Sequence, residues 1–152
     1  MGMLALVLAL ICSTAPTNLP VREWATYVHP QGTFMLRYPP CWNIGTTDDP
    51  QYGFWLHLHA PDGSAEITIK QSRHRGRKQD LRALLAEHEG HIGNCKIAGK
   101  EVPCAIWSER TGEFERAVIY SAQLETSFTS RNLGQWEKEA RKILNSFRLT
   151  GR

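Results

Sequence analysis

Cys95 and Cys104 bracket an eight-residue segment with Gly99-Lys100 near its centre. If Gly99 supplies the positive φ of a type II′ turn, the flanking residues form a β-hairpin in which residue 98 faces residue 101. Cys95 then faces Cys104. The Cβ atoms of such a pair lie about 4.5–5.5 Å apart, close to the separation found in a disulfide. We therefore predict a disulfide-bridged hairpin.

Pro103 has no N–H to donate to the hairpin, so its strand is predicted to be an edge strand or to be bulged there. A two-cysteine metal site and two free thiols stay open as alternatives. A metal would need further ligands, and none lies nearby in the sequence. Because structural disulfides persist mainly in oxidising compartments, the predicted bridge indicates a protein that works outside the cytoplasm.

The N-terminus supports export independently. Ten consecutive apolar residues, 3–12, precede the small polar stretch 13–15, and no charge occurs before Arg22. This pattern is typical of a signal peptide, although a buried helix or strand is the alternative. We predict a signal peptide over 1–15, a flexible lead-in over 16–23 and a single domain over 24–150.

The processing of this N-terminus is left open. Met1-Gly2-Met3 lacks Lys and Arg, so the true start codon is uncertain, and Pro16 directly follows the expected cleavage site at Ala15. A lipoprotein would instead be cleaved before Cys12 and acylated there, but the preceding Ile11 is larger than the small residue expected. We predict a periplasmic or extracellular protein that contacts a membrane only if Cys12 is lipidated. If Cys12 is removed or acylated, Cys41 has no partner and is expected to be a small buried hydrophobe.

Composition narrows the class of protein. The 152 residues suit one domain, and 41% hydrophobic with 22% charged residues indicate a folded chain. A net charge of +3 is too small to indicate a nucleic-acid-binding face, so we expect no nucleic acid as partner. No apolar run approaches the roughly 20 residues that span a bilayer.

Hydrophobic periodicity predicts strands separated by turns. A polar loop is expected over 46–51, and Pro61-Asp62-Gly63-Ser64 is typical of a hairpin turn. Alternating apolar residues and short apolar runs predict strands over 33–38, 54–60, 65–71, 105–107, 114–122 and 124–129.

Two helices are predicted. Asp80 caps the first, which Gly90 ends, and Asn132 with Gln135 forms a capping box for the second. The second helix has a buried stripe at Trp136, Ala140, Ile143, Leu144 and Phe147. Its solvent face is expected to hold Glu137, Lys138, Glu139, Arg141 and Lys142. Hairpin strands with two helices give an antiparallel β-sheet covered by helices, the α+β class.

His57 and His59 are the strongest candidates for metal ligands, because residues two apart on a strand point to the same face. A third ligand would have to come from His29, His88 or His91. The alternative is that they are ordinary histidines lining a sheet face beside Trp55.

The remaining chemistry points away from catalysis. The basic stretch 73–78 could bind anions but lacks the aromatics of a nucleic-acid groove, and a solvated loop is the alternative. The four aspartates sit in predicted turns, loops and a helix cap, and no nucleophile elbow or phosphate-binding loop occurs. We predict no enzyme activity and no cofactor.

Three segments resemble a known family. They are Phe34-Met35-Leu36-Arg37-Tyr38-Pro39-Pro40-Cys41-Trp42, Ile97-Ala98-Gly99-Lys100-Glu101 and Ile143-Leu144-Asn145-Ser146-Phe147-Arg148. Together they are similar to the PsbP/Mog-like superfamily, which includes exported bacterial PsbP-related and DcrB-like proteins. The resemblance implies an antiparallel β-sheet sandwiched between helices, and binding or assembly roles. It carries over no functional residue.

We expect a non-enzymatic exported protein that binds or assembles with a partner protein at the cell envelope. The alternative is a metal or small-ligand binding protein that uses the His57/His59 face. A hydrolase whose site is assembled from residues distant in sequence is a third possibility.

Overall fold

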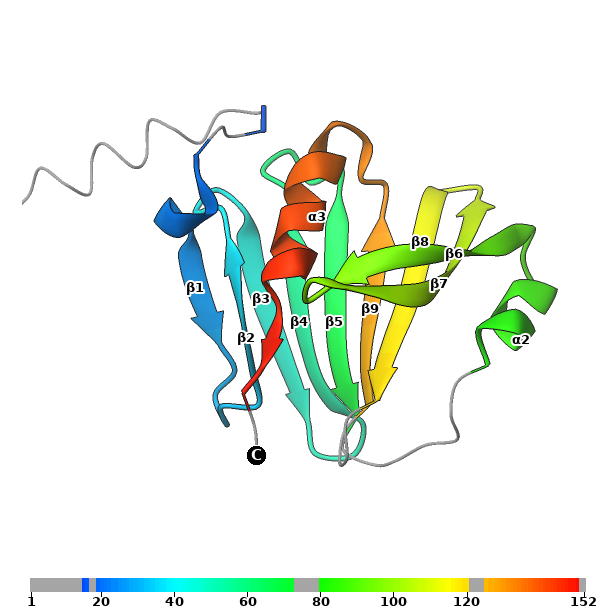
Figure 1. The fold of residues 1–152 in the computed structure, drawn as a ribbon, viewed down its shortest axis with the longest axis horizontal. Helices are drawn as coiled ribbons and strands as arrows, with labels where there is room; N and C mark the ends of the chain where they lie inside the picture. Colours follow the sequence, from blue (N-terminus) through cyan, green and yellow to red (C-terminus); the bar gives the residue numbers. More distant parts are fainter. Residues whose placement is uncertain (1–14, 17–18, 73–79, 121–124, 151–152) are drawn as a thin grey trace, which may run out of the picture.

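A computed structural model describes residues 15–16, 19–72, 80–120 and 125–150, and Figure 1 shows their arrangement. Within these residues the strands form two antiparallel sheets, which confirms the α+β class. The larger sheet has the strand order β3-β4-β5-β9-β8-β7-β6. Its strands are β3 Asn43–Asp49, β4 Gly53–His59, β5 Glu66–Ser72, β6 Gly90–Ile97, β7 Lys100–Glu109, β8 Gly112–Tyr120 and β9 Glu125–Arg131.

The smaller sheet joins the two ends of the described chain. Its central strand β2 (Phe34–Tyr38) pairs with β1 (Ala25–Val28) on one side and with β10 (Arg148–Leu149) on the other. β1 and β10 were not predicted. Both are short and half-exposed or exposed, so they lack the apolar alternation that marks a strand in sequence.

The two helices differ in their contacts with the sheets. α3 (Glu137–Ser146) follows a 3-10 turn over Gly134–Trp136 and packs beside the small sheet (Figure 1). α2 (Leu81–Ala86) contacts β6 and β7, and His88 just after it stacks on Trp107 of β7. A further 3-10 turn, Val21–Glu23, leads into β1.

The core lies between the larger sheet and the layer formed by α3 and the small sheet. All five residues of the predicted α3 stripe are buried, as expected, and the Phe147 ring contacts both Phe34 and Phe128. Glu139 was expected on the solvent face, and this was wrong. It is buried, with only 4% of its surface exposed, because its carboxylate accepts a hydrogen bond from Trp42.

The predicted Cys95–Cys104 disulfide is present, with a Cα–Cα distance of 5.8 Å, but the predicted register is wrong. Ile97 faces Lys100, so Ala98-Gly99 forms the turn, and Cys95 lies opposite Val102. Positive φ angles at Ala98 and Gly99 (53° and 75°) suit a type I′ turn. The register is two residues from the predicted one. Since side chains alternate with a period of two, both cysteines stay on the same face and can still bond.

The structure corrects three further expectations. Thr46 to Asp49 belong to strand β3 and not to a loop, since their backbone pairs with β4 although their side chains are mostly exposed. Cys41 is disulfide-bonded and not an unpaired hydrophobe. Asp80 caps α2 as predicted, but α2 ends at Ala86, and Gly90 begins β6.

Asn132 does not form the predicted capping box. It has a positive φ of 51°, and its amide donates to the carbonyl of Thr111, which ties the end of β9 to the β7–β8 turn. Leu133 occupies the cap position before the 3-10 turn, with no side-chain hydrogen bond.

The predicted signal peptide and the basic stretch 73–78 fall outside the described residues, apart from Ala15. Among the helices of the described chain, none combines the length and apolarity that a membrane crossing needs.

Candidate functional site

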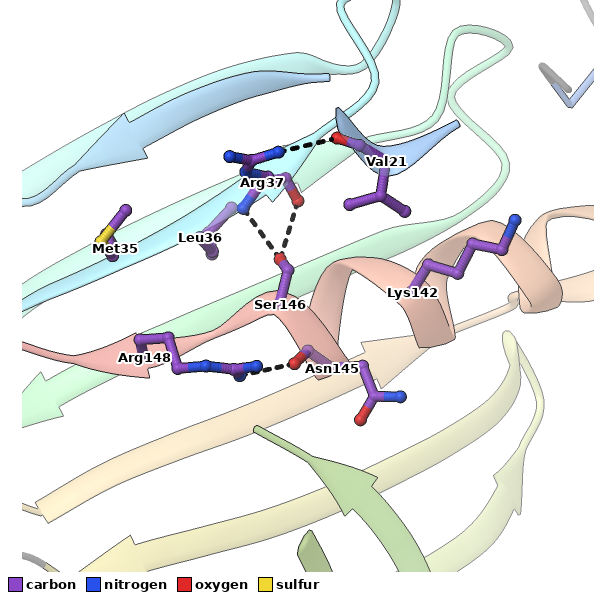
Figure 2. Close-up of a pocket in the computed structure, with 8 residues that line it drawn as sticks. All are labelled: Val21, Met35, Leu36, Arg37, Lys142, Asn145, Ser146 and Arg148. Carbon is purple, nitrogen blue, oxygen red and sulfur yellow. Dashed lines mark hydrogen bonds between the residues drawn. The ribbon is translucent and has the colours of Figure 1, made fainter. Parts of the chain in front are cut away.

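A groove of about 460 Å³ lies between β2, β10 and the C-terminal half of α3 (Figure 2). Three of its described lining residues are basic, and the others are apolar or neutral. The eight lining residues are Val21, Met35, Leu36, Arg37, Lys142, Asn145, Ser146 and Arg148.

The alternation of buried and exposed side chains along β2 determines which of its residues line the groove. Phe34 and Leu36 are fully buried, whereas Met35 and Arg37 between and beyond them point to the other face and are half-exposed. In α3 the buried stripe leaves Lys142 and Ser146 on the side that faces β2. Because side chains alternate along the strand and repeat about every 3.6 residues along the helix, Met35, Arg37 and Lys142 lie on one concave surface.

Ser146 hydrogen-bonds to the backbone of β2 at its edge beside the groove. In the β10–β2 register Arg148 faces Met35, so the position opposite Arg37 would fall to residue 146. Because the chain is still helical there, the Ser146 hydroxyl takes the place of a strand backbone. The Arg37 N–H donates to Ser146 Oγ at 2.8 Å, and this hydroxyl lies 3.1 Å from the Arg37 carbonyl.

Both arginines are held by backbone carbonyls. Arg37 Nη1 donates to the Val21 carbonyl at 3.3 Å, and Arg148 Nη1 donates to the carbonyls of Asn145 and Phe147 at 2.7 and 2.6 Å. Each guanidinium has five N–H donors, so most of them are left for a ligand. The side chains are thus oriented before a ligand arrives.

The groove is electrostatically one-sided. No Asp or Glu is among its described lining residues, and no ion pair between described residues involves Arg37, Lys142 or Arg148. By contrast, Arg141 on α3 pairs with Glu115, and this hydrogen bond raises the pKa of Arg141. An anionic group bound in the groove would meet three uncompensated positive charges.

The predicted histidine pair lies elsewhere, on the face of the larger sheet away from the core. His57 Nδ1 lies 3.2 Å from Thr68 Oγ1 and 3.7 Å from Glu66 Oε1. The other Glu66 oxygen is bound by Arg131 at 2.6 Å. In the portion of the chain that the structure describes, no three His, Cys, Asp or Glu side chains form a metal site.

The other three described histidines do not join His57 and His59. His29 is buried between the rings of Phe34 and Phe54, His88 stacks on Trp107, and His91 is exposed on β6. Among the residues that the structure describes, no third histidine therefore joins the predicted pair.

Asp62, Asp80 and Asp49 have structural roles. Asp62 accepts hydrogen bonds from the backbone N–H and hydroxyl of Ser64 and from Trp136, and these bonds hold its pKa at about 2. Asp80 caps α2. Asp49, the last residue of β3, accepts from the N–H groups of Gln51 and Tyr52.

Comparison with solved structures identifies the architecture. The chain matches a solution structure of cyanobacterial PsbP (CyanoP) from Synechocystis sp. PCC 6803, with a TM-score of 0.53 and 10% identity over 89% of this chain and 97% of that one. The chain has a PsbP-like fold. A crystal structure from Bacteroides thetaiotaomicron VPI-5482 matches with a TM-score of 0.54 and 17% identity over 86% of this chain, which spans about half of that protein's length.

At these identities the PsbP-like fold is what the comparisons establish. No family model matches the sequence. No curated protein matches it either.

Sequence reasoning missed every basic residue of the groove. Arg37 was part of a predicted strand, Lys142 was assigned to a solvated helix face, and Arg148 followed the last helix. Arg37 and Lys142 are more than 100 residues apart, so no local spacing could have brought them together.

Proposed function

We propose that this chain is an exported, non-enzymatic protein that binds a partner protein at the cell envelope through the groove of Figure 2. The observation that carries the proposal is the set of three basic residues, Arg37, Lys142 and Arg148, around the apolar residues Val21 and Met35, with no carboxylate among the described lining residues.

This combination suits an acidic protein segment that carries an apolar side chain. Uncompensated positive charge attracts an acidic surface and accelerates the encounter. Burial of an apolar side chain on Val21 and Met35 then contributes about 25 cal/mol for each Å² removed from water. Since Arg37 and Arg148 are already held, fewer side-chain rotamers are lost on binding.

The PsbP-like fold supports a role without catalysis, because members of the superfamily that the sequence resembles act mostly as binding or assembly proteins. Export is supported by the apolar N-terminal stretch and by the Cys95–Cys104 disulfide. Mass spectrometry of the protein from envelope and periplasmic fractions tests the export step. A mature chain that begins after Ala15, or at an acylated Cys12, supports export, whereas an unprocessed cytoplasmic chain contradicts it.

Site-specific photo-crosslinking in cells tests the groove. A crosslinking amino acid at Lys142 should capture a defined partner, whereas the same amino acid at Arg82, an exposed position on the distant helix α2, should not (Figure 1). The double substitution Arg37→Ala and Arg148→Ala should abolish capture from position 142, and Arg82→Ala should leave it unchanged. Equal capture from both positions, or none from position 142, would exclude the groove as the binding site.

A further inference from the structure

We propose that two copies of this chain associate through β3, whose free edges pair antiparallel about a two-fold axis at Thr46. The two seven-stranded sheets would then form one continuous sheet. This interface is separate from the groove and does not depend on the function proposed for it.

β3 has an accessible edge. It is the first strand of the larger sheet, and within the described residues it pairs with β4 alone. The β3–β4 ladder is continuous from Asn43↔His59 to Asp49↔Gly53, without a bulge. Six of the seven β3 side chains are exposed, and Ile44 exposes 37% of its surface, so neither face of the strand is covered.

This edge also lacks the features that prevent strands from pairing with other chains. Natural edge strands are usually short, bulged, covered, or interrupted by Lys or Pro. β3 is seven residues long and contains neither, whereas β6 at the opposite edge carries an exposed Lys96. The only charges of β3 are Asp48 and Asp49 at its C-terminal end.

The positions of Asp48 and Asp49 favour one register for the pairing of β3 with β3 of a second copy. With Thr46 opposite itself, Asp49 faces Asn43 and Asp48 faces Ile44 of the other copy. At about 3.3 Å for each residue, the two copies of each aspartate lie about 13 Å or more apart. A register centred nearer the C-terminal end would place aspartates opposite each other, and like charges in that position are destabilising. The Asn43 amide can also donate to the Asp49 carboxylate across the interface.

The expected dimer is weak. Stable interfaces bury about 1,200–2,000 Å² in total, and a single pair of edge strands offers less than a packed face does. We therefore expect a concentration-dependent equilibrium with a two-fold, self-complementary interface.

Sedimentation velocity of the mature chain over a range of concentrations provides the first test. The unsubstituted protein should shift from monomer to dimer as concentration rises. Thr46→Lys places two positive charges directly opposite each other and should keep the protein monomeric. Thr47→Lys is a matched control, because residue 47 faces Gly45 of the other copy, and it should still dimerise. A protein that is monomeric at every concentration, or a dimer that Thr46→Lys leaves intact, would overturn the proposal.

Disulfide trapping tests the register. The mature chain is used with Cys41→Ser, and Cys95 and Cys104 are bonded to each other, so Thr46→Cys adds the free thiol. Under mild oxidation Thr46→Cys should form a covalent dimer, because residue 46 faces its own copy. Ile44→Cys should not, since residue 44 lies four positions from its copy along the paired strand. Equal crosslinking of both variants would indicate random collision or another register and would contradict the two-fold at Thr46.

Discussion

Trp42 and Glu139 are separated by 97 residues, and the indole Nε1 of Trp42 donates a 2.5 Å hydrogen bond to Oε1 of Glu139. Both side chains are buried. The Trp42 ring also meets the Trp136 ring edge-on, so the segment between β2 and β3 is joined to the start of α3 by a polar and an aromatic contact. This explains why a glutamate occupies a buried position in a helix whose stripe is otherwise apolar.

Glu139→Leu should destabilise the protein although it adds apolar surface to a buried site. It leaves the Trp42 N–H without its acceptor, which costs about 1–3 kcal/mol. Glu139→Gln retains an acceptor oxygen and should lose less. Urea unfolding followed by tryptophan fluorescence measures both. If Glu139→Leu were as stable as the unsubstituted protein, the hydrogen bond would have no net stabilising role.

Asp62 should make stability depend on pH in the acid range. Its hydrogen bonds lower its pKa from 3.8 to about 2 in the folded protein. The resulting stabilisation is present above the unfolded value near 4 and is lost as the pH falls through about 2. Unfolding titrations at pH 4, 3 and 2 should show a steeper loss for the unsubstituted protein than for Asp62→Asn. Ser64→Ala, which removes only the hydroxyl donor, should lie between them, and identical slopes would contradict this assignment.

Ala98→Gly should stabilise the hairpin turn. Ala98 has a φ of 53°, a left-handed conformation that costs a residue with a Cβ roughly 1 kcal/mol and that glycine adopts freely. The greater freedom of glycine in the unfolded chain offsets part of this gain. We expect a small rise in Tm in scanning calorimetry. Gly99→Ala, at a φ of 75°, is the reciprocal variant and should lower Tm. Opposite signs would argue against the type I′ turn and its register.

Removal of the Cys95–Cys104 disulfide should lower stability without changing the fold. The nine-residue separation is short, so the entropic effect on the unfolded chain is about 2–3 kcal/mol. The double substitution of both cysteines by Ser should reduce the denaturant midpoint while the far-ultraviolet circular dichroism spectrum is retained. A loss of the spectrum would show that the hairpin needs the bridge in order to form.

Local patterns were enough to locate most elements. The alternation of Phe34 with Leu36, and of Ile67 with Ile69, predicted strands that the structure contains. The stripe from Trp136 to Phe147 predicted α3 and its buried face. These signals are readable because burial of one face imposes a fixed period on the chain. β3 and β10 have no buried face, and β1 at most half-buried residues, so none of the three could be found in this way.

The cysteine hairpin shows both what the sequence by itself determined and what it left to the tertiary structure. Local spacing determined that Cys95 and Cys104 would meet on one face of a hairpin. The register was decided by α3, since the N–H groups of Ala98 and Gly99 donate to the Leu144 carbonyl and to Asn145 Oδ1, each at 3.1 Å. The Ala98-Gly99 turn and the predicted Gly99-Lys100 turn differ little in local conformational energy, so these contacts with α3 decide which of them forms.

The groove belongs wholly to the tertiary structure. Arg37, Lys142 and Arg148 come from a strand, a helix and the segment after it, and the packing of α3 beside β2 brings them together. The sequence determined the apolar faces that drive this packing. Which charged side chains then share a surface depends on how the two apolar faces pack against each other. Residues more than 100 positions apart in the sequence show no periodic pattern that would reveal this arrangement.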